Sequence, residues 1–248
     1  MNTKRLEALI RNSLDVFYDR RIRKLSGLKL NDALRKKNPY LFRAVGIQKA
    51  SEIVERLLRD YMSSSDEGIF GDAFFEPISK LCSKGHVAPS AGIDVAIESQ
   101  TTYKAIAVKS GPNIFNASQA KRMNDEFCEL RSRMFKLHKQ FDALLGHGYG
   151  RKSGDPTSKR IYRIRSGQAF WQELTGDSDL YLKLIRLMKD YPTKHRIQFE
   201  EEWAKAVNRF ELRFLEEFAT ADGGIDWEKL TEFNSGVKAK PIKTKTRR

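Results

Sequence analysis

Two segments in which apolar residues alternate with polar or small ones, 93–98 and 105–109, constrain the fold more than any other feature. Alternation with a period of two predicts strands with one buried face, and the polar residues between the segments predict a turn. We therefore expect a β-hairpin with two chemically different faces. If its strands pair, Asp94 and Lys109 converge near one end of the sheet. Position 107 shares the face of Lys109 because it lies two residues earlier.

This layout suits magnesium-dependent phosphodiester hydrolysis. Carboxylates hold a hard cation that prefers oxygen ligands, and a nearby ammonium orients or deprotonates the attacking water and offsets phosphate charge. An Asp followed on the next strand by (D/E)-X-K is the signature of the PD-(D/E)XK nuclease superfamily, which the chain resembles. The stretch VKSGPN at 108–113, with Asn116 and Gln119 after it, resembles the core of PmeII-like type II restriction endonucleases.

The resemblance extends over about residues 15–236 and includes further short sequence motifs, such as NPY at 38–40, FW at 170–171 and GIDWEKL at 224–230. It implies an α/β fold with a restriction-endonuclease-like core, in which helices flank a mixed central sheet and form an extensive elaboration. It also implies cleavage of double-stranded DNA with Mg²⁺. By resemblance, Asp94 is the principal metal ligand and Lys109 orients the attacking water.

One position departs from the family pattern. Where the family carries Glu or Asp as a second metal ligand, this sequence has Ala107 and the motif becomes A-V-K. A site without one of its carboxylates should bind the cation poorly and cleave slowly. Three interpretations stay open: the acid was replaced to trap uncut substrate, a neighbouring carboxylate has taken its place, or the chain is a naturally inactive DNA-binding protein. The neighbouring carboxylates considered are Glu76, Asp125 and Glu126.

The acid in the family's preceding helix matches Glu76. Asp72 lies four residues earlier and therefore on the same helical face, but it is the weaker candidate. The alternative for Glu76 is an ordinary surface carboxylate. We expect its helix to start at the serines 63–65, separately from a helix over about 47–61.

Polar and basic residues after the hairpin are candidates for DNA contact. Amide side chains at the mouth of a nuclease site can hold phosphates or reach base edges, and Asn116 is also the expected N-cap of the next helix. The Gly-rich segment 146–154 does not fit a nucleotide-binding phosphate loop, but with the basic residues after it the segment suits an approach to DNA. The predicted DNA-binding residues are Ser110, Asn113, Asn116, Gln119, Arg151, Lys152, Arg160 and Arg163.

Apolar residues recur at spacings of three and four from Ala117 to Leu144 and predict one helix of about eight turns, which Gly146 would end. The N-terminal segment from Thr3 to about Tyr18 is also predicted to be an amphipathic helix. Residues 167–236 are expected to be largely helical.

The charge balance favours a polyanionic partner. Lys and Arg outnumber Asp and Glu 46 to 32, which gives a formal charge of +14. The last twelve residues, 237–248, hold six basic side chains and no acid, so the rest carries 14 − 6 = +8. We expect this tail to be disordered, with a DNA clamp as the alternative. Residues 1–236 are expected to form a single domain whose catalytic hairpin spans 91–110.

Cys82 and Cys128 are far apart and lack metal-ligand spacing, so we expect reduced thiols in a cytoplasmic protein without a zinc site. No apolar run of 18 residues occurs, and no membrane contact is expected. A two-fold symmetric DNA site implies a homodimer, and the resemblance implies a cognate methyltransferase in the same system without direct contact. The rival functions are a repair or junction-resolving nuclease of the same superfamily and a non-catalytic, sequence-specific DNA-binding protein.

Overall fold

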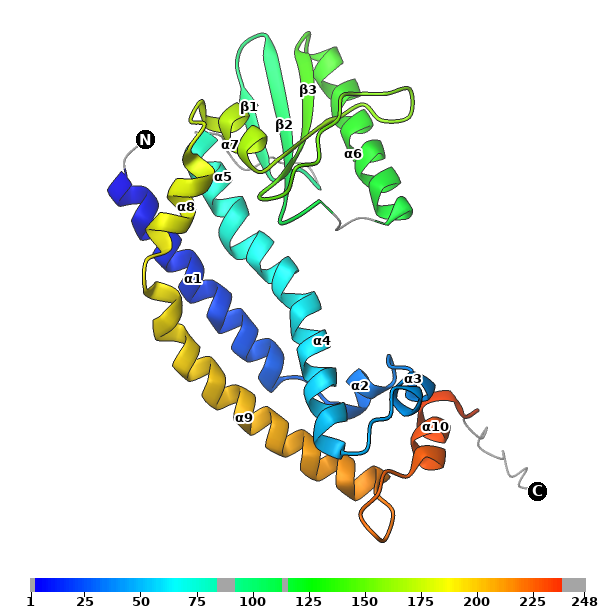
Figure 1. Ribbon diagram of the computed structural model, residues 1–248. Coiled ribbons are helices and arrows are strands. Elements are labelled where there is room, and N and C mark those ends of the chain that lie inside the picture. Colours follow the sequence, from blue (N-terminus) through cyan, green and yellow to red (C-terminus); the bar gives the residue numbers. More distant parts are fainter. Residues whose placement is uncertain (1–2, 84–91, 113–115, 238–248) are drawn as a thin grey trace, which may run out of the picture. The chain divides into compact units, whose positions relative to one another are not determined.

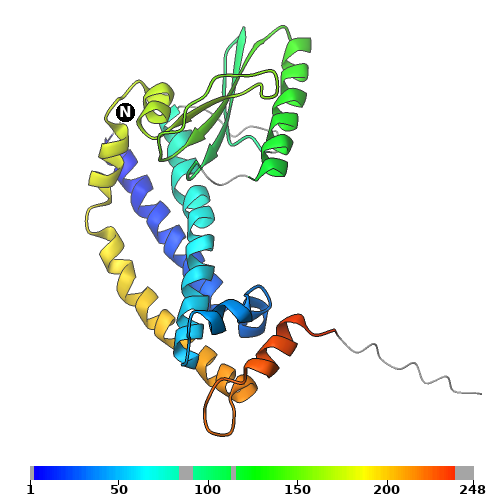
Figure 2. The ribbon, with the colours of Figure 1, turned by 45° about the vertical axis from the view of Figure 1, so that its right-hand side comes forward.

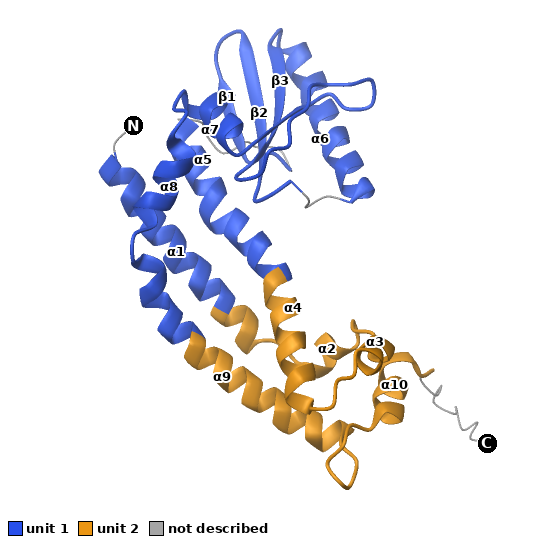
Figure 3. Cartoon of the chain, viewed as in Figure 1, with its two compact units in different colours: residues 1–21, 64–199 blue, residues 22–63, 200–248 orange. Residues whose placement is uncertain are grey.

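The computed structural model describes residues 3–83, 92–112 and 116–237. The chain divides into two compact units, unit 1 with residues 1–21 and 64–199 and unit 2 with residues 22–63 and 200–248 (Figure 3). The single domain expected over residues 1–236 stays a prediction.

Unit 1 is built on a four-stranded mixed sheet (Figure 1). Its strands are β1 (Val95–Glu98), β2 (Thr102–Lys109), β3 (Gln140–His147) and β4 (Arg163–Ser166). They lie in the order β1-β2-β3-β4, with β1 antiparallel to β2, and β2 to β4 parallel to one another. The expected α/β class with a mixed sheet flanked by helices is confirmed.

The predicted hairpin is formed by β1 and β2. Val95 pairs with Ile106, and the turn is closed by a hydrogen bond from Ser99 N to Thr102 O of 2.9 Å. The expected alternation along β2 is confirmed, because Ile106 belongs to one buried cluster and Ala107 to the cluster on the other face.

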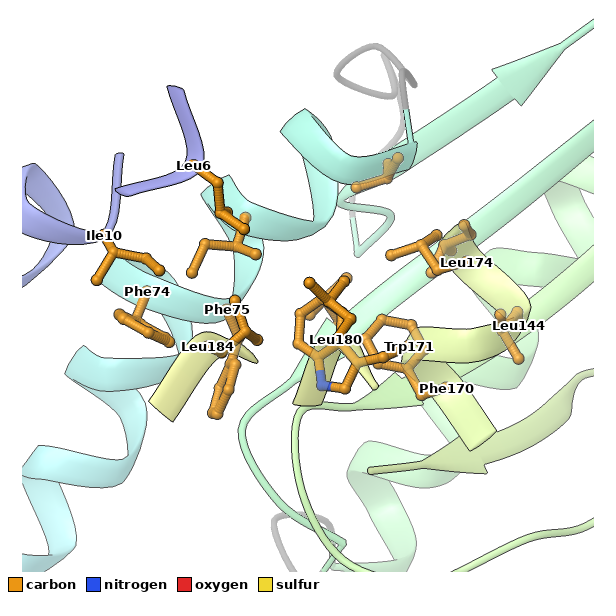
Figure 4. Close-up of a cluster of buried hydrophobic side chains, with 14 of the residues drawn as sticks. Leu6, Ile10, Phe74, Phe75, Leu144, Phe170, Trp171, Leu174, Leu180 and Leu184 are labelled. Atoms are coloured by element: carbon orange, nitrogen blue, oxygen red, sulfur yellow. The ribbon is translucent and has the colours of Figure 1, made fainter. Parts of the chain in front are cut away.

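A different set of helices covers each face of the sheet (Figure 2). Helix α6 (Ala117–Lys136) packs Met123, Phe127 and Leu130 on one face, against residues that include Ala107. The other face carries the cluster drawn in Figure 4, which includes Trp171. Its helical members come from α1 (Thr3–Ser26), the π-helical turn η1 (Gly71–Phe75), α5 (Glu76–Ser83), α7 (Gln168–Thr175) and α8 (Leu180–Met188).

The single long helix predicted from Ala117 to Leu144 is wrong. Helix α6 ends at Lys136, and the chain turns through His138, whose φ of 56° is left-handed, before β3 begins. Residues 143–147 of β3 are all buried, so this strand lacks the alternation of a half-buried strand and its apolar residues also fit a helical spacing of three and four. Gly146 does not end a helix but lies within β3, where an added Cβ would be 2.1 Å from the Phe170 ring.

Two other helix boundaries differ from expectation. Helix α4 (Ala50–Phe70) runs through the serines 63–65 without a break and continues directly into η1 and α5. Backbone hydrogen bonding within one long helix therefore replaces the predicted serine caps. Helix α1 extends to Ser26 and includes the basic run 20–24, beyond its expected end near Tyr18.

Unit 2 is helical. It contains α2 (Leu30–Leu34), α3 (Pro39–Ala44) and α10 (Trp227–Ser235), together with parts of α1, α4 and α9 (Tyr191–Phe218). Its buried side chains include Leu57, Phe210 and Phe214. The Asn234 amide on α10 donates to the carbonyls of Leu34 and Lys37, at 3.1 and 2.8 Å. In the described residues, none of the helices is both long and apolar enough to cross a membrane.

We expect Gly146→Ala to destabilise the protein by about 1–3 kcal/mol, because the new methyl group would force apart β3 and the buried Phe170 ring. Gly68→Ala is the matched control. Gly68 lies inside α4 with nothing within 4 Å of an added Cβ. This substitution should stabilise the helix by up to about 1 kcal/mol. Urea unfolding measures both, and equal effects would contradict the packing argument.

Candidate active site

The hairpin brings Asp94 and Lys109 together at one end of the sheet, as predicted. Asp94 N donates to Ile106 O at 3.0 Å, which continues the strand pairing one residue beyond β1. Asp94 Oδ2 accepts a hydrogen bond from the backbone amide of Val108 at 2.6 Å and lies 3.7 Å from Lys109 Nζ. The carboxylate is thus fixed by the backbone of the strand that carries the lysine.

The charges around Asp94 extend the site to helix α5. Burial raises the pKa of Asp94 above its ordinary value, while the Lys109 ammonium and the Val108 amide act in the opposite direction. The negative charge of Glu76 also raises this pKa. Glu76 is the first residue of α5, and its Oε1 lies 2.6 Å from Lys80 Nζ. Two carboxylates and two ammonium groups therefore act on one another here.

Ala107 is fully buried on the face that α6 covers. It pairs with Leu145 of β3 and lies two residues before Lys109 on the same strand. In residues 3–83, 92–112 and 116–237, no group of three or more His, Cys, Asp and Glu side chains is placed to hold a metal ion. Magnesium is usually bound through one or two carboxylates, with substrate oxygens and water as further ligands. Asp94 and Glu76 supply carboxylates of the kind that such a site uses.

The other two acids considered as substitutes lie on α6. Glu126 approaches Gly92 so closely that an added Cβ there would be 1.8 Å from Glu126 Oε2, and Gly92 also has a left-handed φ of 74°. Glu126 Oε1 accepts a hydrogen bond from Arg122 at 3.0 Å. Asp125 is exposed. Of the three acids, Glu76 is the one whose charge is seen to act on Asp94.

Sequence reasoning missed Glu67, which holds the residue that follows Lys109. Ser110 Oγ donates to Glu67 Oε2 at 2.7 Å, and the Tyr149 hydroxyl donates to Glu67 Oε1 at 3.2 Å. Glu67 on α4 thereby ties the end of β2 to the segment after β3. Glu67 follows the serines 63–65 closely in the sequence. The periodicity of apolar residues could not reveal its contact with Ser110, because the two residues are 43 positions apart. Since Ser110 is buried and bonded to Glu67, its predicted DNA contact would require this bond to break.

Asn116 and Gln119 begin α6 with a capping box. Asn116 Oδ1 accepts from Gln119 N at 2.9 Å, and Gln119 Oε1 accepts from Asn116 N at 3.1 Å. The predicted N-cap is therefore confirmed. Both side chains use only their oxygens in this bonding and are exposed, so their NH₂ groups point to no partner among the described residues. Asn113 lies outside the described residues.

The remaining predicted DNA contacts lie between β3 and β4 or on β4. Arg151 and Lys152 are exposed. Arg160 donates to the carbonyl oxygens of Asp155 and Tyr162, at 2.6 and 3.1 Å, so its orientation is fixed while its charge is not neutralised by these partners.

Arg163 is engaged inside the protein. Its Nη2 lies 2.7 Å from both Asp142 Oδ2 and Glu173 Oε1, and hydrogen bonds to Glu173 and Asp142 raise the pKa of the guanidinium. Lys104 Nζ lies 2.8 Å from the same Glu173 carboxylate. This network joins β2, β3 and β4 to α7. The DNA contact predicted for Arg163 stays a prediction, and it would require Arg163 to exchange these partners for DNA.

The fold and the site together define a restriction-endonuclease-like core, in which a mixed sheet presents an acid and a lysine on adjacent strands. The sequence model of the type II restriction endonuclease EcoO109I family matches residues 4–196. The match covers more than half of the chain, and the protein belongs to this family. A search of curated proteins finds no match.

We expect Glu67→Ala to lower the free energy of unfolding by about 1–2 kcal/mol, because the buried Ser110 hydroxyl would lose its acceptor. Glu129→Ala, which removes an exposed acid paired with Arg133 one turn along α6, should change stability by less than about 0.5 kcal/mol. Equal effects of the two substitutions in urea unfolding would show that Glu67 does not hold the end of β2.

The Glu173 network should make stability sensitive to acid. Burial raises the pKa of Glu173, but the hydrogen bonds from Arg163 and Lys104 outweigh it and hold the pKa below its ordinary value of 4.5. The contribution of Glu173 to stability is therefore present at neutral pH and lost as the pH falls below 4.5 through the lowered pKa. Unfolding midpoints should fall less steeply with acid in Glu173→Gln than in the unchanged protein, and parallel curves would contradict this assignment.

Proposed function

We propose that the chain is a type II restriction endonuclease of the PmeII-like kind, which cleaves double-stranded DNA at a specific sequence with Mg²⁺. We also propose that Ala107 impairs its activity. The observation that carries this proposal is the convergence of Asp94 and Lys109, 3.7 Å apart, in the core that the family match covers. Membership of the family supplies the substrate class, and the formal charge of +14 agrees with it.

In this proposal Asp94 and Glu76 hold the magnesium ion, which when bound supplies Lewis acidity and lowers the pKa of a coordinated water. Lys109 orients the attacking water and offsets the negative charge that develops on the phosphate. The amide of Val108 keeps Asp94 in place while the cation binds, because it donates to Oδ2 at 2.6 Å. Each of these groups belongs to the hairpin or to the first turn of α5.

Ala107 removes a ligand from the strand that carries Lys109. A carboxylate at this position would share the face of Lys109, and the methyl group offers no oxygen. The proposal that Ala107 replaced an acid agrees with the retention of Asp94, Lys109 and Glu76 around it. The proposal that an acid has migrated rests on Glu76, whose charge acts on Asp94.

For DNA contact we propose the residues that are exposed or carry uncompensated charge, namely Asn116, Gln119, Arg151, Lys152 and Arg160. Ser110, Asn113 and Arg163 stay predictions of the sequence. We further propose a homodimer that cuts both strands, action in the cytoplasm and a cognate methyltransferase that protects host DNA.

A non-catalytic DNA-binding protein is the second candidate. It is favoured by the complete burial of Ala107 among apolar side chains, since that environment suits a methyl group as well as any residue.

The decisive experiment digests long, unmethylated phage DNA with magnesium, using the unchanged protein and its Ala107→Glu variant. We expect discrete bands from the Glu variant and at least about a hundredfold slower cutting by the unchanged protein, because a metal ligand is restored. Ala107→Gln is the matched control, since it has nearly the same shape without the charge. Asp94→Asn within the Glu variant should abolish cutting.

The outcomes separate the candidates. Equal cutting by the unchanged protein and the Glu variant would show that an acid has migrated, and Glu76→Gln should then stop it. If neither protein cuts but both retard DNA, the chain is a DNA-binding protein and the nuclease proposal fails.

A further inference from the structure

A cavity of about 340 Å³ lies in unit 1 between α6, the ends of β3 and β4 and the segment that joins these strands. Four cationic side chains line it, and the described residues of its lining include no Asp or Glu. The cationic residues are Lys121, Lys152, Lys159 and Arg160.

The charges of these four residues are not neutralised within the described part of the chain. Lys121, Lys152 and Lys159 form no ion pair with another described residue. Among the described residues, Arg160 donates only to neutral carbonyl oxygens, and these bonds leave most of its five N–H groups for another acceptor. Four ammonium and guanidinium groups around one cavity repel one another, so an anion in the cavity would relieve this repulsion.

His147 lies at the wall of the cavity and relates it to the candidate active site. It is 1% exposed, and its Nδ1 lies 2.8 Å from Ser166 Oγ on β4. Burial and the nearby Lys152 lower the pKa of His147 to about 4, so the ring is neutral at pH 7. Along the sheet, His147 is the pairing partner of Lys109. Neighbouring strands lie about 4.8 Å apart, so the cavity begins one strand away from the proposed catalytic lysine.

We infer that this cavity binds one phosphate of the DNA backbone, next to the phosphate that reacts at Asp94 and Lys109. The inference rests on the proposed nuclease function and adds a subsite to it. A DNA strand presents phosphates in succession, and each brings one negative charge and two oxygens that accept hydrogen bonds. The lysines supply the charge, while Arg160 supplies N–H groups in a fixed orientation. Lys109 and His147 lie side by side on β2 and β3. A DNA backbone that crosses these two strands would therefore pass from the proposed catalytic lysine to the cavity.

The first test measures binding of a non-specific duplex by the full chain without magnesium, as a function of salt. Lys121→Ala with Lys159→Ala should lower affinity roughly 10- to 100-fold at ~0.1 M salt and reduce the log–log salt slope by about 1.8, if each lysine releases one counterion. Arg131→Ala with Lys136→Ala is the matched control, because it removes two exposed cations farther along α6. Equal losses in both double variants would overturn the subsite.

The second test asks where the DNA lies. The ¹³C-labelled His147 ring, assigned with His147→Gln, should change its NMR shift when the duplex binds, and this change should disappear in Lys121→Ala with Lys159→Ala. A duplex that binds without moving the His147 signal would overturn the subsite and leave the nuclease proposal standing. A shift with inorganic phosphate but not with the duplex would assign the cavity to a small anion and also overturn it. Failure of the full chain to bind any duplex would overturn the nuclease proposal as well.

Discussion

The parallel pairing of β2 with β3 is the constraint on which the rest of unit 1 depends. It aligns Ala107 with Leu145 and Lys109 with His147, so the register that buries the sheet also decides which polar groups meet at its end. Both strands are buried on their two faces, and a shift of one residue would turn every apolar side chain on β2 to the wrong cluster. The position of Lys109 is therefore secured by the packing of the core rather than by its own contacts.

Acidic groups at the site have different kinds of support. The backbone of β2 holds Asp94, whereas Glu76 is paired with Lys80 on the next turn of its helix. Both side chains of this pair are half-buried, and a carboxylate that pairs with a lysine side chain can exchange this partner for a cation without a change in the backbone. A carboxylate bound by a buried amide stays in place. Under the proposed function, Asp94 would therefore be the fixed ligand of the magnesium ion and Glu76 the adjustable one.

The hairpin could be predicted because its signals are local. The alternation of apolar and polar residues, the polar turn and the spacing of Asp94, Ala107 and Lys109 all lie within one short segment. Strand β3 was misread as the end of α6 because burial on both faces removes the alternation that identifies a strand. The contact between Glu67 and Ser110 and the cation-lined cavity could not be predicted for a related reason, since the residues that form each of them come from separate elements. The ion pairs of Arg163 could not be predicted either, because Asp142 and Glu173 become its partners only in the folded sheet.

The π-helical turn η1 has a consequence for the phase of the helix around it. An unbroken α-helix rotates about 100° per residue, so Glu67 and Glu76, nine residues apart, would point to nearly opposite sides. A π turn accommodates an additional residue and delays this rotation. Both acids can therefore serve the same end of the hairpin, Glu67 at Ser110 and Glu76 near Asp94. The π-helical turn therefore changes the direction in which the later side chains point. It lets α4 and α5 direct the Glu67 and Glu76 carboxylates to one side, whereas a regular helix would direct them to opposite sides.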